Sequence, residues 1–184
     1  MKQRTQMGTT DMTARTDLAR ARKSLADRPD LVRLVLDMTD TTEQPIITTP
    51  ETALPVLRSL LLRPDVMRRE KFAVIAVDRR QRLVDAAVLT TGTDAFTIVD
   101  PKQVLSWCLA RPGTAAFIVG HNHPSGDATP SDADEQVTTR LHAAGKVVGV
   151  PLLDHIVLGG TGYVSMAERG KVPTGCWEPV MVSR

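Results

Sequence analysis

The chain has 184 residues, a length that fits one domain with an additional segment. Hydrophobic residues make up 42% and charged residues 24% of the sequence. These proportions are typical of a soluble globular protein and exclude collagen-like, coiled-coil and wholly disordered chains. The formal net charge of +2 is too small to indicate a nucleic-acid partner by itself.

The first 45 residues are predicted to form a polar, basic N-terminal arm. Residues 1–24 contain six basic and two acidic residues, a net charge of +4. Residues 17–38 have the helical spacing of apolar side chains that favours one or two short helices. A solvated leader is the favoured interpretation of the arm, and a contact surface for DNA, RNA or an acidic protein is the alternative.

Cysteine usage and hydropathy indicate the cellular compartment. Cys108 and Cys176 lie far apart and form no C-x-x-C motif, so neither a disulfide framework nor a cysteine zinc site is predicted. No apolar run approaches the roughly 18 to 20 residues of a membrane span, and no hydrophobic signal-peptide core follows the N-terminus. We therefore expect a cytoplasmic protein without a membrane partner.

The folded domain is predicted to extend from residue 46 to 172, with a C-terminal tail over 173–184. All six aromatic residues lie beyond residue 71, so the core must come from this part of the chain. A capping threonine followed by a proline and an acid predicts a helix over 50–62. Two apolar segments, 71–78 and 82–90, then predict a β-hairpin.

The second half of the domain continues this alternation of helices and strands. An aspartate and a proline predict a helix over 101–110, and residues 114–120 form an apolar run typical of a central strand. Ser131 is predicted to begin a helix that reaches about Ala144 and ends at Gly145. Two further strands are expected at 146–150 and 152–159. This order predicts an α/β (α+β) fold with a mixed sheet.

The stretch 120–135, GHNHPSGDATPSDADE, contains the residues with the clearest chemistry. Side chains two apart on a strand share a face, so His121 and His123 project together while Asn122 faces away. Asp134 lies in the first turn of the next helix and can turn back toward the strand end. Two neutral histidines and one carboxylate leave a fourth tetrahedral position open, as in catalytic rather than structural zinc sites.

The same residues also match a helix cap. Ser131 and Asp134 form a capping box, in which Asp134 accepts a hydrogen bond from the Ser131 amide. The cap alone would require no metal, but two in-phase histidines immediately upstream favour the metal site. We expect that Asp134 cannot both close the box and hold the metal.

Other metal motifs fit this stretch less well. The letters HNH do not indicate an HNH nuclease, whose residues are dispersed over a longer unit. Zinc deaminases require H-x-E and a later P-C-x-x-C, which the chain lacks. An iron oxygenase with two histidines and one carboxylate is chemically compatible, although its usual ligand order is the reverse of this one.

The spacing H-x-H-x(7)-S-x-x-D, together with HNHPSGD and LLDHIVLG, resembles the RadC branch of the bacterial JAMM (MPN+/JAB) metalloproteins over about residues 46–170. The resemblance implies an MPN/JAB fold, a mixed β-sheet sandwiched by helices in the three-layer arrangement of cytidine deaminases. It also implies that His121, His123 and Asp134 bind one Zn²⁺ per chain. Ser131 would donate a hydrogen bond to the oxyanion of a tetrahedral intermediate.

The family also uses a glutamate as general base at the start of the strand after the first core helix. Glu70 occupies that place here, and an exposed acid at a strand end is the alternative role. Asp85 is a weaker candidate because it lies in the middle of a strand.

Four more residues are expected around the site. Asp154 and His155 belong to the RadC-like signature, but alternation points them to opposite faces, so a place behind the ligands or in the core is favoured over metal ligation. Asn122 and Ser125 are expected at the rim.

The resemblance implies a zinc metallopeptidase that attacks an amide or isopeptide bond in a protein or peptide. The alternative is a DNA-repair or DNA-processing protein with nuclease activity at the same site, and a third interpretation is a catalytically idle binding module. RadC proteins usually carry a glycine-containing helix-hairpin-helix module that binds DNA. Only Gly8 precedes residue 92 here, so we expect this module to be absent, which weakens the DNA interpretation. An oligomer is left open.

Overall fold

The computed structural model describes residues 44–62, 69–92, 99–160 and 162–172. The expected helices within 17–38 and the tail over 173–184 lie outside these residues. The described elements follow one another in the order α3 (Pro50–Leu61), β1 (Lys71–Val77), β2 (Leu83–Thr91), α4 (Pro101–Leu109), β3 (Ala116–Asn122), α5 (Asp132–Val148), β4 (Leu152–Leu158) and β5 (Tyr163–Ser165).

The strands form one five-stranded sheet in the order β2-β1-β3-β4-β5. β1 pairs with both β2 and β3 in antiparallel orientation, and β3 pairs with β4 in parallel. The sheet is therefore mixed. β1 and β3 occupy its centre, and all of their residues are buried, as expected for strands covered on both faces.

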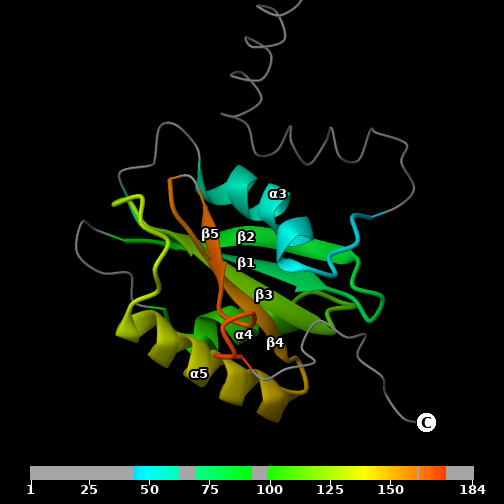
Figure 1. Cartoon of the computed structure of the whole chain (residues 1–184). Helices are drawn as coiled ribbons and strands as arrows, with labels where there is room; N and C mark the ends of the chain where they lie inside the picture. Colours follow the sequence, from blue (N-terminus) through cyan, green and yellow to red (C-terminus); the bar gives the residue numbers. More distant parts are fainter. Residues whose placement is uncertain (1–43, 63–68, 93–98, 161, 173–184) are drawn as a thin grey trace, which may run out of the picture. The chain divides into compact units, whose positions relative to one another are not determined.

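Helices cover both faces of the sheet (Figure 1): α3 lies on one face, and α4 and α5 lie on the other. Alternate residues of each central strand enter separate hydrophobic clusters, so Ile75 and Ile118 pack in the cluster of α3, while Val74 and Val119 pack in that of α4 and α5. These three layers confirm the predicted fold class.

The α3 side of β3 leaves no room for a side chain at Gly120. A Cβ atom there would lie 2.8 Å from Leu57 of α3 and 3.0 Å from the carbonyl oxygen of Ile156. The glycine therefore lets α3 approach the sheet closely. The neighbouring His121 points to the opposite face, where it stacks on Phe72.

The prediction for the end of α5 was wrong. The helix continues to Val148 and ends at Gly149, which adopts a left-handed conformation with φ 74°. Residues 146–150 are thus the last turn of the helix and its cap rather than a strand. Gly145 lies inside the helix and packs closely against the segment that follows it. A Cβ atom there would lie 2.6 Å from the carbonyl oxygen of Val150. The short strand β5 was not predicted.

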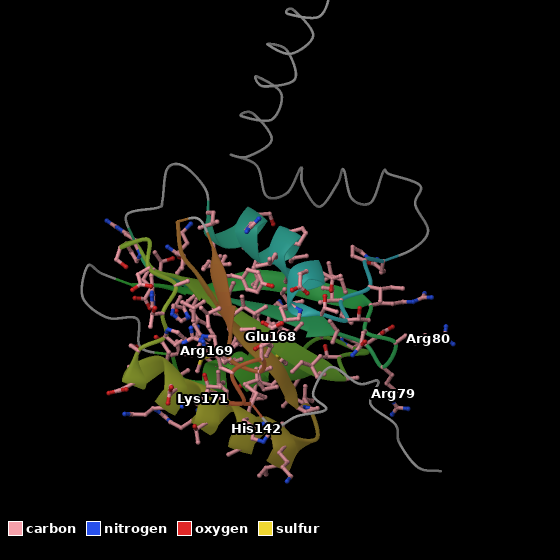
Figure 2. All side chains as sticks on the ribbon, in the orientation of Figure 1. Arg79, Arg80, His142, Glu168, Arg169 and Lys171 are labelled. Atoms are coloured by element: carbon pink, nitrogen blue, oxygen red, sulfur yellow. The ribbon has the colours of Figure 1, made fainter. Side chains whose placement is uncertain are left out.

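Figure 2 labels basic side chains at two separate places on the surface. Arg79 and Arg80 lie at the turn between β1 and β2, whereas Arg169 and Lys171 follow β5 near α5. Lys171 forms an ion pair of 2.9 Å with Glu135, which joins the segment after β5 to α5. Within the described part of the chain, no helix has the length and apolar character needed to span a membrane.

Candidate metal centre

The end of β3 and the first turn of α5 bring His121, His123 and Asp134 together. The Nε2 atoms of the two histidines are 2.9 Å apart. The Asp134 carboxylate lies 3.2 Å from His121 Nε2 through Oδ1 and 3.6 Å from His123 Nε2 through Oδ2. Each residue directs one possible ligand atom into a region where these atoms are within 4.8 Å of one another.

These separations fit a single small cation. In a tetrahedral zinc site with bonds of about 2.0 to 2.1 Å, the ligand atoms lie roughly 3.3 Å from one another. The separations of 2.9, 3.2 and 3.6 Å in this cluster bracket that value. The residues present therefore fit the metal that the donor set implies.

Asp134 serves the helix cap and the cluster at the same time. Its Oδ2 accepts hydrogen bonds from the Ser131 backbone N–H (2.7 Å) and the Ser131 hydroxyl (2.6 Å), which closes the capping box. Its Oδ1 faces His121. The expectation that Asp134 cannot both close the box and hold a metal stays a prediction, and the cap occupies only Oδ2 of the two carboxylate oxygens.

A chain of buried hydrogen bonds determines which nitrogen of His121 carries a proton. Thr138 donates its hydroxyl to the Asp134 carbonyl oxygen (2.6 Å), so Thr138 Oγ1 must accept from His155 Nδ1 (2.7 Å). Neutral His155 then accepts at Nε2 from His121 Nδ1 (2.8 Å). His121 therefore has its proton on Nδ1, and the lone pair of its Nε2 faces the cluster.

His123 is oriented in the same sense by a different group. Its Nδ1 lies 2.7 Å from the carbonyl oxygen of Asp127, which can only accept, so His123 donates from Nδ1. Its Nε2 is then available at the cluster. Two imidazole nitrogens and a carboxylate oxygen thus converge, and the cluster has a place for one cation, a proton or a metal ion.

Burial and the carboxylate set the protonation of this cluster. Burial lowers the pKa of His121 to about 4 and holds that of His155 well below its ordinary value, so both rings are neutral at pH 7. The hydrogen bond with Asp134 raises the pKa of His123. Burial would raise the pKa of Asp134, but its interactions with His123, His121 and Ser131 lower it below its ordinary value.

Glu70 precedes β1 and is half-buried. Phe72 of β1 pairs with His121 of β3, and the antiparallel direction carries Glu70 toward the His123 end of β3. The Glu70 charge is the smallest of the effects on the pKa of His123, after the Asp134 hydrogen bond, burial and the remaining contacts. Glu70 is therefore near the cluster, and its backbone is held beside β3 by the Asn122 side chain.

The other candidate residues lie away from the converging atoms. Asp154 is buried and accepts hydrogen bonds from Ser165 Oγ and from the backbone of His155 and Ala167. Asp85 forms an ion pair of 2.8 Å with Arg111. Ser125 is exposed and accepts from the Asp127 N–H through Oγ, at 3.3 Å, within the loop that follows β3.

Sequence reasoning missed Thr138 and the Asp127 carbonyl, which orient the two histidines. Thr138 lies one helical turn after Asp134, a spacing that places both on one side of α5. That spacing was visible in the sequence, but the contact of Thr138 with His155 was not, because it depends on how α5 packs on β4.

The comparisons with known proteins agree with this geometry. A model of the RadC-like JAB domain matches residues 47–171. A UPF0758 protein of Symbiobacterium thermophilum is 42% identical over 101 residues, which are 55% of this chain and 43% of that protein. A UPF0758 protein of Cyanothece sp. is 38% identical over 135 residues, which are 73% of this chain and 54% of that protein. The chain thus spans about half the length of these curated relatives. By the extent of the domain match, the chain belongs to the RadC-like JAB domain family.

Proposed function

We propose that this protein is a zinc-dependent hydrolase that cleaves an amide or isopeptide bond in a protein or peptide. The convergence of His121 Nε2, His123 Nε2 and an Asp134 oxygen is the observation that supports the proposal. Zn²⁺ with these three ligands supplies a polarised water whose pKa falls from about 15.7 to near 7. The family and the bare ring nitrogens support a resident metal, and the choice of zinc follows from the ligand types.

Glu70 acts as the base and then the acid in this proposal. It takes a proton from the water that attacks the carbonyl carbon, and it returns the proton to the amine nitrogen when the C–N bond breaks. Ser131 turns its hydroxyl from Asp134 Oδ2 to the oxyanion, while its backbone N–H continues to hold the carboxylate.

The small number of candidate ligands favours an amide rather than a phosphodiester as the bond that the protein hydrolyses. Nucleases commonly use two metal ions about 3.5 to 4 Å apart. Among the residues that the structure describes, the candidate metal ligands form one group with a single carboxylate. One ion and one nearby glutamate match the requirements of carbonyl hydrolysis.

The test measures zinc content and hydrolysis on the same preparation. We expect about one zinc per chain, and cleavage of some members of a panel of linear and lysine-branched peptides. Glu70→Gln should retain zinc and lose about 10² to 10⁴ in rate. Ser131→Ala should lose about 10² to 10³ in kcat. Glu168→Gln, a change of an exposed glutamate in the segment after β5, is the matched control and should keep the wild-type rate.

The outcome also separates the alternatives. Labelled single- and double-stranded DNA are incubated in parallel with the peptides. Cleavage of DNA that requires both Glu70 and His123, without cleavage of any peptide, would replace the proposal with a nuclease. A protein that folds normally and binds no zinc would overturn the hydrolase proposal in both forms.

A further inference from the structure

We infer that Asn122 is a positioning residue that holds the backbone on both sides of Glu70. The inference rests on the proposed function, because it matters for catalysis only if Glu70 is the base. Asn122 lies between the two histidine ligands in β3, and its side chain is directed to neither of them. It is instead hydrogen-bonded to the backbone of the segment at the start of β1.

The contacts of Asn122 bracket Glu70. Its Oδ1 accepts a hydrogen bond from the Lys71 backbone N–H at 3.0 Å, and its Nδ2 donates to the Arg69 carbonyl oxygen at 3.1 Å. The amide is only 2% exposed. Both polar ends of a buried amide are thus used, one on each side of the same residue, which is the arrangement that fixes a short backbone segment.

These bonds continue the attachment of the chain beyond the regular sheet. The ladder between β1 and β3 ends at the pair Phe72 and His121. The Asn122 side chain provides the next two contacts toward the N-terminus, at residues 71 and 69. On the other side, Gly92 donates its N–H to the Glu70 carbonyl oxygen at 2.8 Å. Glu70 is therefore held between β2 and β3.

One strand then sets the relative position of the metal ligands and the base. His121 lies in β3, His123 follows the strand directly, and the residue between them holds the backbone around Glu70. A base must lie within hydrogen-bond reach of the proton that it removes, and small displacements of catalytic groups reduce rates strongly. A side chain that joins the two groups provides this alignment.

The first test measures backbone amide exchange in metal-free protein by NMR. Asn122→Leu removes the acceptor for Lys71 and should speed exchange of the Lys71 amide by about tenfold. Asn122→Asp keeps an acceptor oxygen and should leave that amide protected. Asp78→Ala is the matched control: Asp78 accepts from the backbone of Arg80 and Arg82 at the other end of β1, so those amides should exchange faster while Lys71 does not change.

The second test follows Glu70 itself, with Co²⁺ as the probe. The visible spectrum of the Co²⁺ protein is recorded as a function of pH. Glu70→Gln should shift the pH at the midpoint of the spectral change by about one unit. Asn122→Leu should bind Co²⁺ with the same stoichiometry and shift the midpoint in the same direction. The double variant should shift it no further, because both changes remove the same interaction. Asp78→Ala should keep the wild-type midpoint.

The two failures are distinguishable. If Glu70→Gln leaves the midpoint unchanged, Glu70 does not act at the metal, and both the proposed function and this inference fail. If Glu70→Gln shifts the midpoint and Asn122→Leu does not, only the role of Asn122 is overturned. Should Asn122→Leu not fold, Asn122→Ser provides the same comparison with a smaller side chain that also lacks the amide.

Discussion

Proton positions on single side chains leave the His121–His123–Asp134 cluster with the lone pairs that a metal ion needs. The Thr138 hydroxyl can donate only one hydrogen bond, and the Asp134 carbonyl oxygen accepts it. This forces the proton of His155 onto Nδ1 and that of His121 onto its own Nδ1, so the His121 Nε2 lone pair is presented without a competing hydrogen. A threonine that contacts none of the three clustered side chains thereby selects the tautomer of one of them.

Thr138→Val should weaken Zn²⁺ binding by about 10- to 100-fold, measured by competition with a chelator of known affinity. Valine has nearly the shape of threonine but leaves His155 Nδ1–H without an acceptor, so the ring favours the tautomer that reverses the chain of hydrogen bonds. Thr139→Val is the matched control. Thr139 is exposed, and its hydroxyl donates to the Glu135 carbonyl in the same helix. Equal affinities for the two variants would contradict the chain of proton positions.

Among the secondary-structure elements, α5 connects the candidate metal ligands to the core. Its N-terminal cap holds Asp134, its first turns contact His155, and its last turns pack at Gly145 against the loop that enters β4. The loop approaches so closely because position 145 lacks a side chain. This contact explains why a glycine stands inside the helix, which ends instead at the left-handed Gly149.

Gly145→Ala should lower the free energy of unfolding by about 1 to 3 kcal/mol. Alanine favours a helix by about 1 kcal/mol over glycine, but its Cβ would lie 2.6 Å from the Val150 carbonyl oxygen, and backbone can move little there. Urea unfolding monitored by circular dichroism measures the difference. Val147→Ala, at a side chain that is 86% exposed, should change stability little. A Gly145→Ala protein that is more stable than the wild type would show that the loop around Val150 can move to make room for the added methyl group.

β4 and β5 are joined through a buried carboxyl group, and this should make stability depend on pH. Burial raises the pKa of Asp154 to about 6, whereas an unfolded aspartate has a pKa of about 3.9. Between these values the folded state binds a proton that the unfolded state does not. The contribution of Asp154 is therefore complete below about pH 4 and is lost as the pH rises through about 6.

The measurement compares wild type with Asp154→Asn, both metal-free, in urea at pH 5 and pH 7.5. The free energy of unfolding of the wild type, relative to that of the variant, should be higher at pH 5 than at pH 7.5 by on the order of 1 kcal/mol. The comparison cancels the opposite contributions of His121 and His155, whose folded pKa values are lowered. A difference between the two proteins that is independent of pH would show that Asp154 stays ionised in the fold.

For the whole molecule, the candidate metal site joins three separate elements of the fold. The ligands come from β3 and α5, and their supporting groups come from β4. A cation that binds this arrangement and not the unfolded chain must stabilise the domain as a unit.

At a free Zn²⁺ concentration about a thousandfold above the dissociation constant, the added stability is about 4 kcal/mol. The melting temperature should then rise by roughly 8 to 16 °C over that in chelator, as measured by calorimetry. His123→Ala is the control and should lose most of this difference, because it removes one of the three ligands. A rise of the same size in the variant would place the stabilising ion elsewhere.

The sequence by itself determined the features whose partners are close in the chain. His121, His123 and Asp134 lie within one strand, one turn and one helix start, and local periodicity and capping place them without knowledge of the rest of the fold. The same local signals predicted the hairpin, a central strand that is covered on both faces, and the order of the main elements.

Only the tertiary structure decided what joins distant positions. His155 contacts His121 across 34 residues and Thr138 across 17, and Asn122 holds the Lys71 amide across 51. The close packing of Gly145 on the ring of Phe117 and on the entry to β4 likewise depends on how α5 lies on the sheet. Periodicity gives the face on which a side chain lies but not the neighbour that it meets there. That neighbour is set by the pairing of strands and the packing of helices on the sheet, which also decide the proton positions and the alignment of Glu70.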